Sequence, residues 1–253
     1  MPSLSATIIA RNESDTVARA IRSLECADEV VVVDSGSTDD TVSLAQSLGA
    51  RVVPHRWGGF AAQKNFAAAQ ARHDWILSLD ADEELDPEAQ QAVVHWKNSA
   101  PSAAGYRWAR RARYLGRWIR HSGWYPDYKL RLFDRRRGRW QGAYLHESVL
   151  VEGPVETLPG HILHYTCDSL EEHRQRIELY TDLAAREMLE RDERVGALRR
   201  LLVAPWIFFE TYFLRLGILD GRQGYLIARM AARYVAMKFE KLNRLREAGL
   251  GET

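Results

Sequence analysis

The feature that most constrains the fold is an alternation of apolar runs with helix-like segments over the first hundred residues. Predominantly apolar runs, the second of them an unbroken β-branched run, occupy positions 4–10, 30–33, 51–54 and 75–79. Segments with helical spacing of apolar residues lie between them, and Pro87 opens another that extends to about residue 99. Strands that alternate with helices at this spacing predict a doubly wound α/β sheet with right-handed crossovers.

Polar clusters follow three of the predicted strands. They are Arg11-Asn12-Glu13, Asp34-Ser35-Gly36-Ser37 and Asp80-Ala81-Asp82-Glu83. In open α/β sheets, ligands bind beyond the carboxyl ends of the strands. We therefore expect these three clusters to converge on one crevice.

The turn Asp80-Ala81-Asp82 places two carboxylates one residue apart. Such a pair can face one divalent cation, and Mg²⁺ and Mn²⁺ prefer oxygen ligands and often complete their shell with substrate phosphates. The turn is therefore predicted to hold a metal that neutralises the charge on a leaving diphosphate. The alternative is a solvated acidic turn that caps the helix at Pro87.

Three other polar residues have both a functional and a structural interpretation. Asp34 closes an apolar strand, where a carboxylate can accept from a base or a ribose hydroxyl. It can also cap the next helix, although Ser37 or Thr38 is predicted to do so. Glu13 is equally suited to the first turn of a helix, and Lys64 either meets a phosphate or remains solvated.

The second half of the chain changes character twice. Residues 106–151 contain short strands rich in Trp, Tyr and Arg, which predicts an antiparallel extension with loops over the site. Beyond Ser169, which begins a capping box, the sequence is helical. We predict a catalytic domain over residues 1–165, with nucleotide-sugar binding in 1–100 and the acceptor side in 101–165. A helical extension follows over 166–253.

Charge and cysteine content exclude several classes of protein. With 35 basic and 34 acidic residues, the chain has almost no net charge that would attract it electrostatically to nucleic acid. Cys26 and Cys167 are far apart and outside any zinc-ligand spacing, so we expect a reduced, cytoplasmic protein. We also expect no signal peptide, and no apolar run reaches the roughly 18 residues of a spanning helix.

Four of these groups together resemble the successive motifs of the family 2 glycosyltransferases, which are inverting enzymes of the GT-A fold. They are Ala10-Arg11-Asn12-Glu13, Asp34-Ser35-Gly36-Ser37-Thr38-Asp39, Lys64-Asn65 and Leu79-Asp80-Ala81-Asp82-Glu83. Later groups resemble the branch that contains bacterial lipopolysaccharide-core glucosyltransferases. These are Trp124-Tyr125-Pro126-Asp127, Arg131-Leu132-Phe133 and His146-Glu147. The resemblance covers nearly the whole chain and implies a Rossmann-like mixed sheet with a C-terminal helical extension.

The resemblance also implies a role for individual residues. Asp82 would be the direct ligand of Mg²⁺ or Mn²⁺, and Asp80 would contact the ribose or the metal. The donor would be a nucleotide-diphospho-sugar, a UDP-sugar in this branch. Its expected binding residues are Ala10, Arg11, Glu13, Asp34, Lys64, Asp80 and Ala81.

An inverting transfer needs a general base for the acceptor hydroxyl, and Glu147 and Asp127 are the candidates. We favour Glu147 because the apolar residues 149–151 that follow it should hold it firmly. The family's more usual base lies in a Glu-Asp pair that this sequence lacks, and a salt bridge to an arginine is the structural alternative. Three histidines are candidates for a further metal or phosphate ligand: His146, His161 and His164. The alternative for each is a structural role. Sugar stacking or core packing would suit Trp124, Tyr125 and Trp140 equally.

Residues 201–209 are almost wholly apolar and follow Arg199 and Arg200. Such a helix can lie in a membrane interface with its arginines on anionic headgroups, or pack on the catalytic domain or a second subunit in a homodimer. We expect a peripheral protein at the inner face of the cytoplasmic membrane that transfers a hexose to a lipid-linked glycan such as the lipopolysaccharide inner core. Two alternatives are a polyprenyl-phosphate or peptide glycosyltransferase and a non-catalytic nucleotide-binding or membrane-scaffold protein. Retention of both Asp80 and Asp82 speaks against the last.

Overall fold

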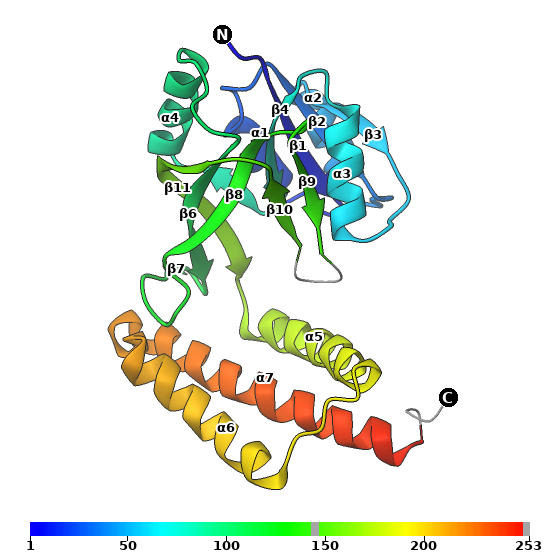
Figure 1. Ribbon diagram of the computed structural model, residues 1–253, viewed down its shortest axis with the longest axis vertical. Helices are drawn as coiled ribbons and strands as arrows, with labels where there is room; N and C mark the ends of the chain where they lie inside the picture. The colour runs from blue at the N-terminus through cyan, green and yellow to red at the C-terminus, as the bar shows by residue number, and fades with distance from the viewer. Residues whose placement is uncertain (143–146, 250–253) are drawn as a thin grey trace. The chain divides into compact units, whose positions relative to one another are not determined.

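The structure is a computed structural model that describes residues 1–142 and 147–249 (Figure 1). The chain forms two compact units. The first comprises Met1–Arg111 and Asp127–Tyr165. The second comprises Ala112–Pro126 and Thr166–Thr253, so it is assembled from two separate stretches of sequence.

The first unit is built on four parallel strands in the order β3-β2-β1-β4. They are β1 (Leu4–Ala10), β2 (Glu29–Asp34), β3 (Arg51–Pro54) and β4 (Trp75–Asp80). The register pairs Ala10 with Asp34 and Ile9 with Asp80. The three polar clusters therefore leave the sheet at the same edge, as the strand order predicts.

Helices connect these strands as the apolar spacing predicts. They are α1 (Val17–Arg22), α2 (Thr41–Ser47), α3 (Phe60–Gln70) and α4 (Pro87–Lys97). The predicted cap of α2 is wrong, because its N-cap residue is Asp40. Ser37 and Thr38 are engaged elsewhere: the Ser37 hydroxyl accepts from the Asn12 amide, and the Thr38 amide donates to the Asn12 side chain.

Antiparallel strands extend the sheet beyond β4 in the order β8-β6-β11-β5, so the sheet is mixed. These strands are β5 (Glu83–Leu85), β6 (Gly105–Tyr114), β8 (Asp127–Asp134) and β11 (Val155–Cys167). The short β7 (Arg117–Trp118) pairs with β6, while β9 (Gly138–Gln141) and β10 (Ser148–Val151) form a separate two-stranded sheet. The antiparallel extension is confirmed, and β8 pairs directly with β4.

The core of the first unit lies where α1 and α4 cover the sheet. Leu4, Ile8 and Leu77 are completely buried there, together with Trp108. Burial of a side chain of this size stabilises the fold by about 1.5–3 kcal/mol. Because these residues come from three strands of one sheet, the core fixes the strand ends and hence the loops beyond them.

The second unit is helical. It contains α5 (Leu170–Glu190), α6 (Ala197–Phe209), the π turn η1 (Glu210–Leu214), the 3₁₀ turn η2 (Gly217–Asp220) and α7 (Gly221–Glu247). In it α7 lies between α5 and α6 (Figure 1). The predicted capping box is confirmed, since the Ser169 hydroxyl accepts from the Glu172 amide at 3.1 Å. The buried side chains of α5 are Ile177, Thr181, Ala185 and Met188.

Two separate stretches of the second unit are joined by one buried carboxylate. Asp220, which is 1% exposed, accepts from the backbone amides of Arg120 and His121 and from the Ser122 hydroxyl. Hydrogen bonds from several donors compensate a buried carboxylate for the water that it loses on folding. Residues 112–126 are thereby fixed to the start of α7.

No single helix within the described residues is long and apolar enough to cross a membrane. The segments Ala197–Leu214 and Gly217–Glu247 meet the requirement of length and composition only as a pair, and that pair is bent by 71°.

Candidate active site

A continuous series of ion pairs runs through the first unit at the edge where the polar clusters leave the sheet. We call it the ion-pair chain. In order it contains Glu147, Lys64, Asp80, Arg131, Glu83, Arg110, Asp127 and Lys129. Acids and bases alternate throughout, so each carboxylate lies beside at least one cation.

Lys64 is the most deeply buried cation of the ion-pair chain. It lies on α3 with its side chain 1% exposed, and its ammonium group is 2.7 Å from Asp80 Oδ1 and 3.0 Å from Glu147 Oε1. The ring of Trp140 lies 4.3 Å from the same ammonium. The Asn65 side chain holds Trp140 in place by exchanging two hydrogen bonds with its backbone. The sequence predicts that Lys64 contacts a diphosphate. In the structure, Lys64 lies between two carboxylates instead.

Arg131, on β8, joins Asp80 to Glu83. Its guanidinium lies 2.9 Å from Asp80 Oδ2 and 2.7 Å from Glu83 Oε1. Burial by itself would raise the pKa of Asp80, but the charges of Lys64 and Arg131 outweigh it and hold that pKa far below its usual range. Burial likewise opposes ionisation of Glu83, and Arg131 again lowers its pKa below the usual value. Both carboxylates are therefore ionised at neutral pH.

Asp82 has a different environment from Asp80. Its Oδ2 atom lies 3.2 Å from Nε2 of His164, and its side chain is 25% exposed. The position of His164 follows from the sheet, because the pairing of β11 with β5 sets it opposite Glu83. The structure thus brings Asp82 together with one of the three histidines considered from the sequence. His146 lies outside the described residues.

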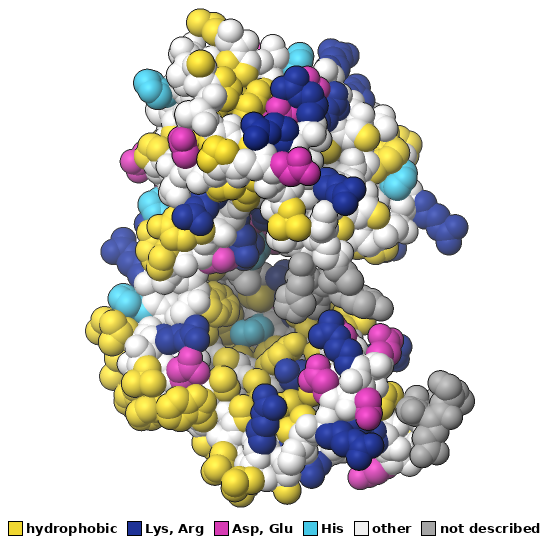
Figure 2. Space-filling view, viewed as in Figure 1, with side chains coloured by type: hydrophobic (Ala, Val, Ile, Leu, Met, Phe, Trp, Pro, Cys, Tyr) yellow, Lys and Arg dark blue, Asp and Glu magenta, His cyan; other side chains and the backbone are white. Residues whose placement is uncertain are grey.

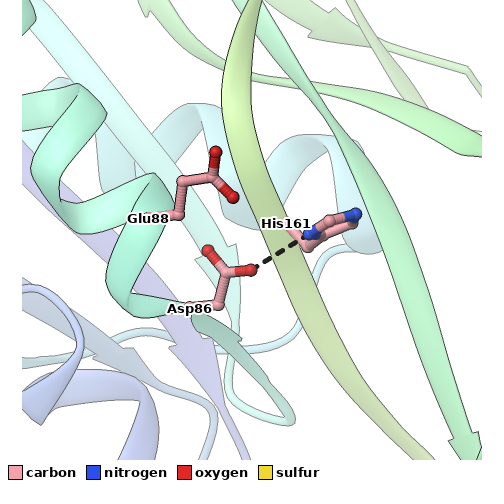
Figure 3. A group of neighbouring side chains, drawn as sticks. All are labelled: Asp86, Glu88 and His161. Atoms are coloured by element: carbon pink, nitrogen blue, oxygen red, sulfur yellow. Dashed lines mark hydrogen bonds and ion pairs between the residues drawn. The ribbon is translucent and has the colours of Figure 1, made fainter.

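His161 belongs to a second group with Asp86 and Glu88, shown in Figure 3. Asp86 caps α4 by accepting from the amide of Ala89 at 2.8 Å, and it also lies 3.0 Å from Nδ1 of His161. Nε2 of His161 lies 3.1 Å from a guanidinium nitrogen of Arg111, which can only donate, so Nδ1 carries the proton. Because both ring nitrogens are engaged, we assign this group to the helix cap.

The loops after β1 and β2 are bound to each other. Asn12 adopts a left-handed backbone with φ +56°. Its side chain accepts from the Thr38 amide at 2.8 Å, and its own amide donates to the Ser37 hydroxyl at 2.9 Å. The carboxylate of Asp34 accepts from the amides of Gly36 and Ser37. The structure therefore places Asp34 at the centre of the turn, with only 6% of its surface exposed.

A hollow of about 300 Å³ opens at the ends of β2 and β3. Its lining consists of Asp34, Ser35, Gly36, Pro54, His55 and Arg56. Buried Gln63 supports one wall by donating to the Ser35 hydroxyl, and its side-chain oxygen lies 2.9 Å from His55 Nδ1. Sequence reasoning missed His55, Arg56 and Gln63. The position of Gln63 directly before Lys64 was the one available signal.

The remaining predicted residues occupy the same sheet edge or the core. Ala10 is buried, whereas Arg11 is exposed. Glu13 accepts from the Thr16 hydroxyl at 2.6 Å, but it precedes the N-cap of α1 and is not in the first turn of that helix. Ala81 is buried between the two acidic residues of its turn.

Two further residues of the ion-pair chain, Arg110 and Asp127, are 2.7 Å apart. Asp127 is a predicted base, whereas Arg110 was missed because nothing distinguishes it from its neighbouring arginines in the sequence. Among the aromatics, Trp140 is 3% exposed and packs on Ile76 and Phe133. Trp124, in the second unit, packs edge-on against Tyr114.

Comparison with known proteins gives a consistent result. Residues 5–151 match the profile of the family described as "Glycosyl transferase family 2". The chain is 30% identical to an uncharacterized glycosyltransferase of Rickettsia conorii, over 98% of this chain and 91% of that protein. It is 32% identical to the lipopolysaccharide core biosynthesis glycosyltransferase LpsC of Rhizobium meliloti, over 94% of this chain and 91% of that protein.

Among solved structures, the chain resembles glucosyl-3-phosphoglycerate synthase from Mycobacterium tuberculosis in complex with Mn²⁺, UDP and glucosyl-3-phosphoglycerate. The identity is 25% over 44% of each chain, with a TM-score of 0.36.

Proposed function

Because the chain belongs to glycosyl transferase family 2, we propose that it transfers a hexose from a UDP-sugar, with inversion, to a lipid-linked glycan such as the lipopolysaccharide inner core. The observation that carries this proposal is the contrast between Asp80 and Asp82. Asp80 is paired with the two buried cations Lys64 and Arg131, whereas Asp82 faces His164, although the two aspartate side chains are similarly exposed at 28% and 25%. The two acidic residues therefore have different tasks.

Asp82 and His164 are the residues that would hold the divalent metal. A carboxylate oxygen and an imidazole nitrogen 3.2 Å apart are donors that Mn²⁺ accepts, and Mg²⁺ favours the carboxylate. Both side chains are partly exposed, so a metal and a diphosphate can reach them. Bound there, the metal would neutralise charge on the leaving diphosphate. Asp80 instead fixes the geometry of the turn through Lys64 and Arg131.

Glu147 is the proposed general base. It uses Oε1 for Lys64 and is 16% exposed, so its carboxylate is both held and accessible. In Asp127, by contrast, both oxygens are occupied, Oδ2 by Arg110 and Oδ1 by Lys129. A base must have an oxygen within hydrogen-bond reach of the acceptor hydroxyl, and Glu147 meets this requirement better.

The proposed reaction is a single displacement. The acceptor hydroxyl attacks the anomeric carbon while Glu147 takes its proton. The bond from the anomeric carbon to the diphosphate oxygen breaks on the opposite face, so the configuration inverts and the nucleoside diphosphate leaves with the bonding electrons. Lys64 holds the Glu147 carboxylate during attack, since it is fixed from the other side by Asp80.

The surface of α6 supports the membrane part of the proposal. α6 has no buried side chain, and Leu198, Leu201 and Trp206 are 70%, 71% and 54% exposed. Figure 2 shows hydrophobic side chains gathered over α6 and the turns that follow it, at the lower left. Exposed apolar patches of this kind mark interaction sites, and exposed Arg199 and Arg200 suit anionic headgroups. We therefore place the protein peripherally at the inner face of the cytoplasmic membrane.

The donor part of the proposal can be tested by thermal shift with UDP-sugars and other nucleotide-sugars, with and without Mn²⁺. A ligand that binds only the native state raises its stability. We expect a shift with a UDP-sugar that increases with Mn²⁺ and is absent in Asp82→Asn. The proposal would be refuted by equal shifts in wild type and variant.

The alternatives differ at the acceptor. A polyprenyl-phosphate or peptide glycosyltransferase would show the same donor binding but transfer sugar to those acceptors, while a scaffold protein would bind donor without turnover.

A further inference from the structure

The second unit contains an apolar pocket that the proposed chemistry does not use. Its volume is about 380 Å³, and it lies among α5, α6 and α7. The walls are apolar. They come from all three helices, from the segment around Trp124 and from the end of β11. The lining includes Trp124, Cys167, Ile177, Ile207, Ile227 and Ala231.

Two of the polar groups in this lining are engaged by protein partners. Nδ1 of His173 lies 2.7 Å from the Tyr114 hydroxyl, and Arg176 is paired with Glu172 at 2.7 Å. No carboxylate lines the pocket within the described residues. A sugar or nucleotide needs several convergent polar groups to fix its orientation, and this lining offers mostly hydrocarbon and aromatic surface instead.

The hollow is a partly open pocket of the helical unit rather than an enclosed void. Apolar surface in contact with water is stabilised when an apolar partner covers it. Apolar cavities are also poor hosts for water, because water needs two to four polar partners there. The side chains around the hollow would gain dispersion contacts from an apolar occupant.

The pocket and the exposed apolar surface share one helix, α6. Ile207 of α6 lines the pocket, whereas Trp206 and Phe209 belong to the exposed face of the helix. Residues 194–233 contain seven arginines and two acidic residues. Of those two acids, Asp220 is buried and Glu210 is paired with Arg215 at 2.6 Å. Positive charge around an apolar surface complements an anionic lipid bilayer.

We propose that this pocket holds one acyl chain of a membrane lipid, drawn from the bilayer on which α6 docks. The proposal rests on the membrane docking of the proposed function but not on its chemistry. An acyl chain in the pocket would bury apolar surface of both the lipid and the protein, which is favourable. The lipid would then anchor the second unit more firmly than contact with α6 alone.

The test is a titration of the full-length protein with cis-parinaric acid, a fluorescent eighteen-carbon fatty acid, without donor or acceptor. We expect saturable 1:1 binding to wild type. Ala231→Phe fills the pocket and should weaken binding by about tenfold or more, which corresponds to about 1.4 kcal/mol. Its matched control is Ala232→Phe, the same change on the next residue of α7, which is outside the lining. This control should bind like wild type.

Thermal melting shows whether each variant is folded. If Ala231→Phe melts below wild type, the smaller change Ala231→Leu replaces it. That variant should melt like wild type and lose part of the binding. Equal binding by all variants would place the fatty acid on the surface and overturn the proposal, as would the absence of saturable binding to wild type. A protein that binds cis-parinaric acid but fails in every transferase assay would refute the proposed function and leave this inference standing.

Discussion

The ammonium group of Lys64 lies 3.0 Å from Oε1 of Glu147, although 83 residues separate the two in the chain. The same ammonium lies 2.7 Å from Asp80. The proposed base and the acidic turn therefore share one buried cation, and a change at either residue alters the electrostatic environment of the other.

Removal of this cation should lower the free energy of unfolding. Lys64→Met leaves Asp80 and Glu147 without their shared partner, and loss of one member of a buried ion pair destabilises proteins by about 3–5 kcal/mol. Urea denaturation monitored by tryptophan fluorescence measures the effect.

Lys97→Met is the matched control for that variant. Lys97 also lies 2.7 Å from an aspartate, Asp28, but it is 22% exposed rather than 1%. Exposed pairs contribute about 0–1 kcal/mol, so this variant should unfold close to wild type. Equal losses in both variants would contradict the importance of burial.

Asp82→Asn should abolish most metal-dependent transfer while the fold survives. The side chain is partly exposed and contributes to no core cluster, so the melting temperature should change little. Lewis-acid help is worth several kcal/mol, so turnover should fall on the order of a hundredfold or more. Steady-state rates across a Mn²⁺ titration, with EDTA as the metal-free reference, provide the measurement. Unchanged turnover would rule out Asp82 as the metal ligand.

Glu147→Gln should lower turnover without weakening the binding of the donor. General bases contribute about 10²–10⁴-fold, and the glutamine still accepts a hydrogen bond from Lys64 at the same place. Rates and UDP affinity should be measured in parallel with Asp127→Asn. If Asp127→Asn shows the large loss of turnover and Glu147→Gln does not, the base is Asp127.

Acid should weaken the first unit through the ion-pair chain. The folded pKa values of Asp80 and Glu83 lie below their ordinary values of 3.8 and 4.5. The unfolded state therefore binds protons first as the pH falls. The stability that these carboxylates contribute is complete above about pH 4.5 and is lost below it, toward their folded pKa values.

The comparison of wild type with Glu83→Gln isolates this contribution. The variant should be less stable at pH 7, and the difference in urea midpoint should shrink as the pH falls toward 3. Glu88→Gln, at an exposed position on α4, should follow wild type throughout. A difference that stays constant with pH would contradict the lowered pKa of Glu83.

Membrane docking through α6 predicts flotation with phosphatidylglycerol vesicles, less flotation with neutral phosphatidylcholine, and a loss at high salt because the arginine contribution is screened. Serine at both Leu198 and Leu201 should abolish it, since these side chains are 70% and 71% exposed. Leu179→Ser, at a 57% exposed position on α5, is the control and should float like wild type. Flotation of the double variant would exclude α6 as the docking surface, and a concentration-dependent dimer lost in the same variant would assign the surface to self-association.

Elements specified by local pattern were predictable. The runs at 4–10 and 51–54 coincide with β1 and β3, because β-branched residues between turn signals favour strands regardless of what surrounds them. The start of α2 was not predictable in the same way. Ser37 bonds to Asn12, 25 residues away, and that contact removes it from the cap.

The site was predictable in its residue types but not in its pairing. The acidic turn and its sheet edge follow from strand order. The partners of Asp80 do not, because Lys64 and Arg131 come from a helix and a strand that meet it only in the folded chain. Nor does local pattern reveal that residues 112–126 join the C-terminal helices.

That last arrangement affects how the protein can be divided or recombined. Tyr114 and Ile119 are completely buried in a cluster with Leu226 and Ile227, and Asp220 fixes the same stretch to α7. A chain truncated after residue 165 would keep half of this cluster and expose it to water. Exchange of the second unit between relatives therefore requires transplanting two segments together, 112–126 and the helices from 166 onward.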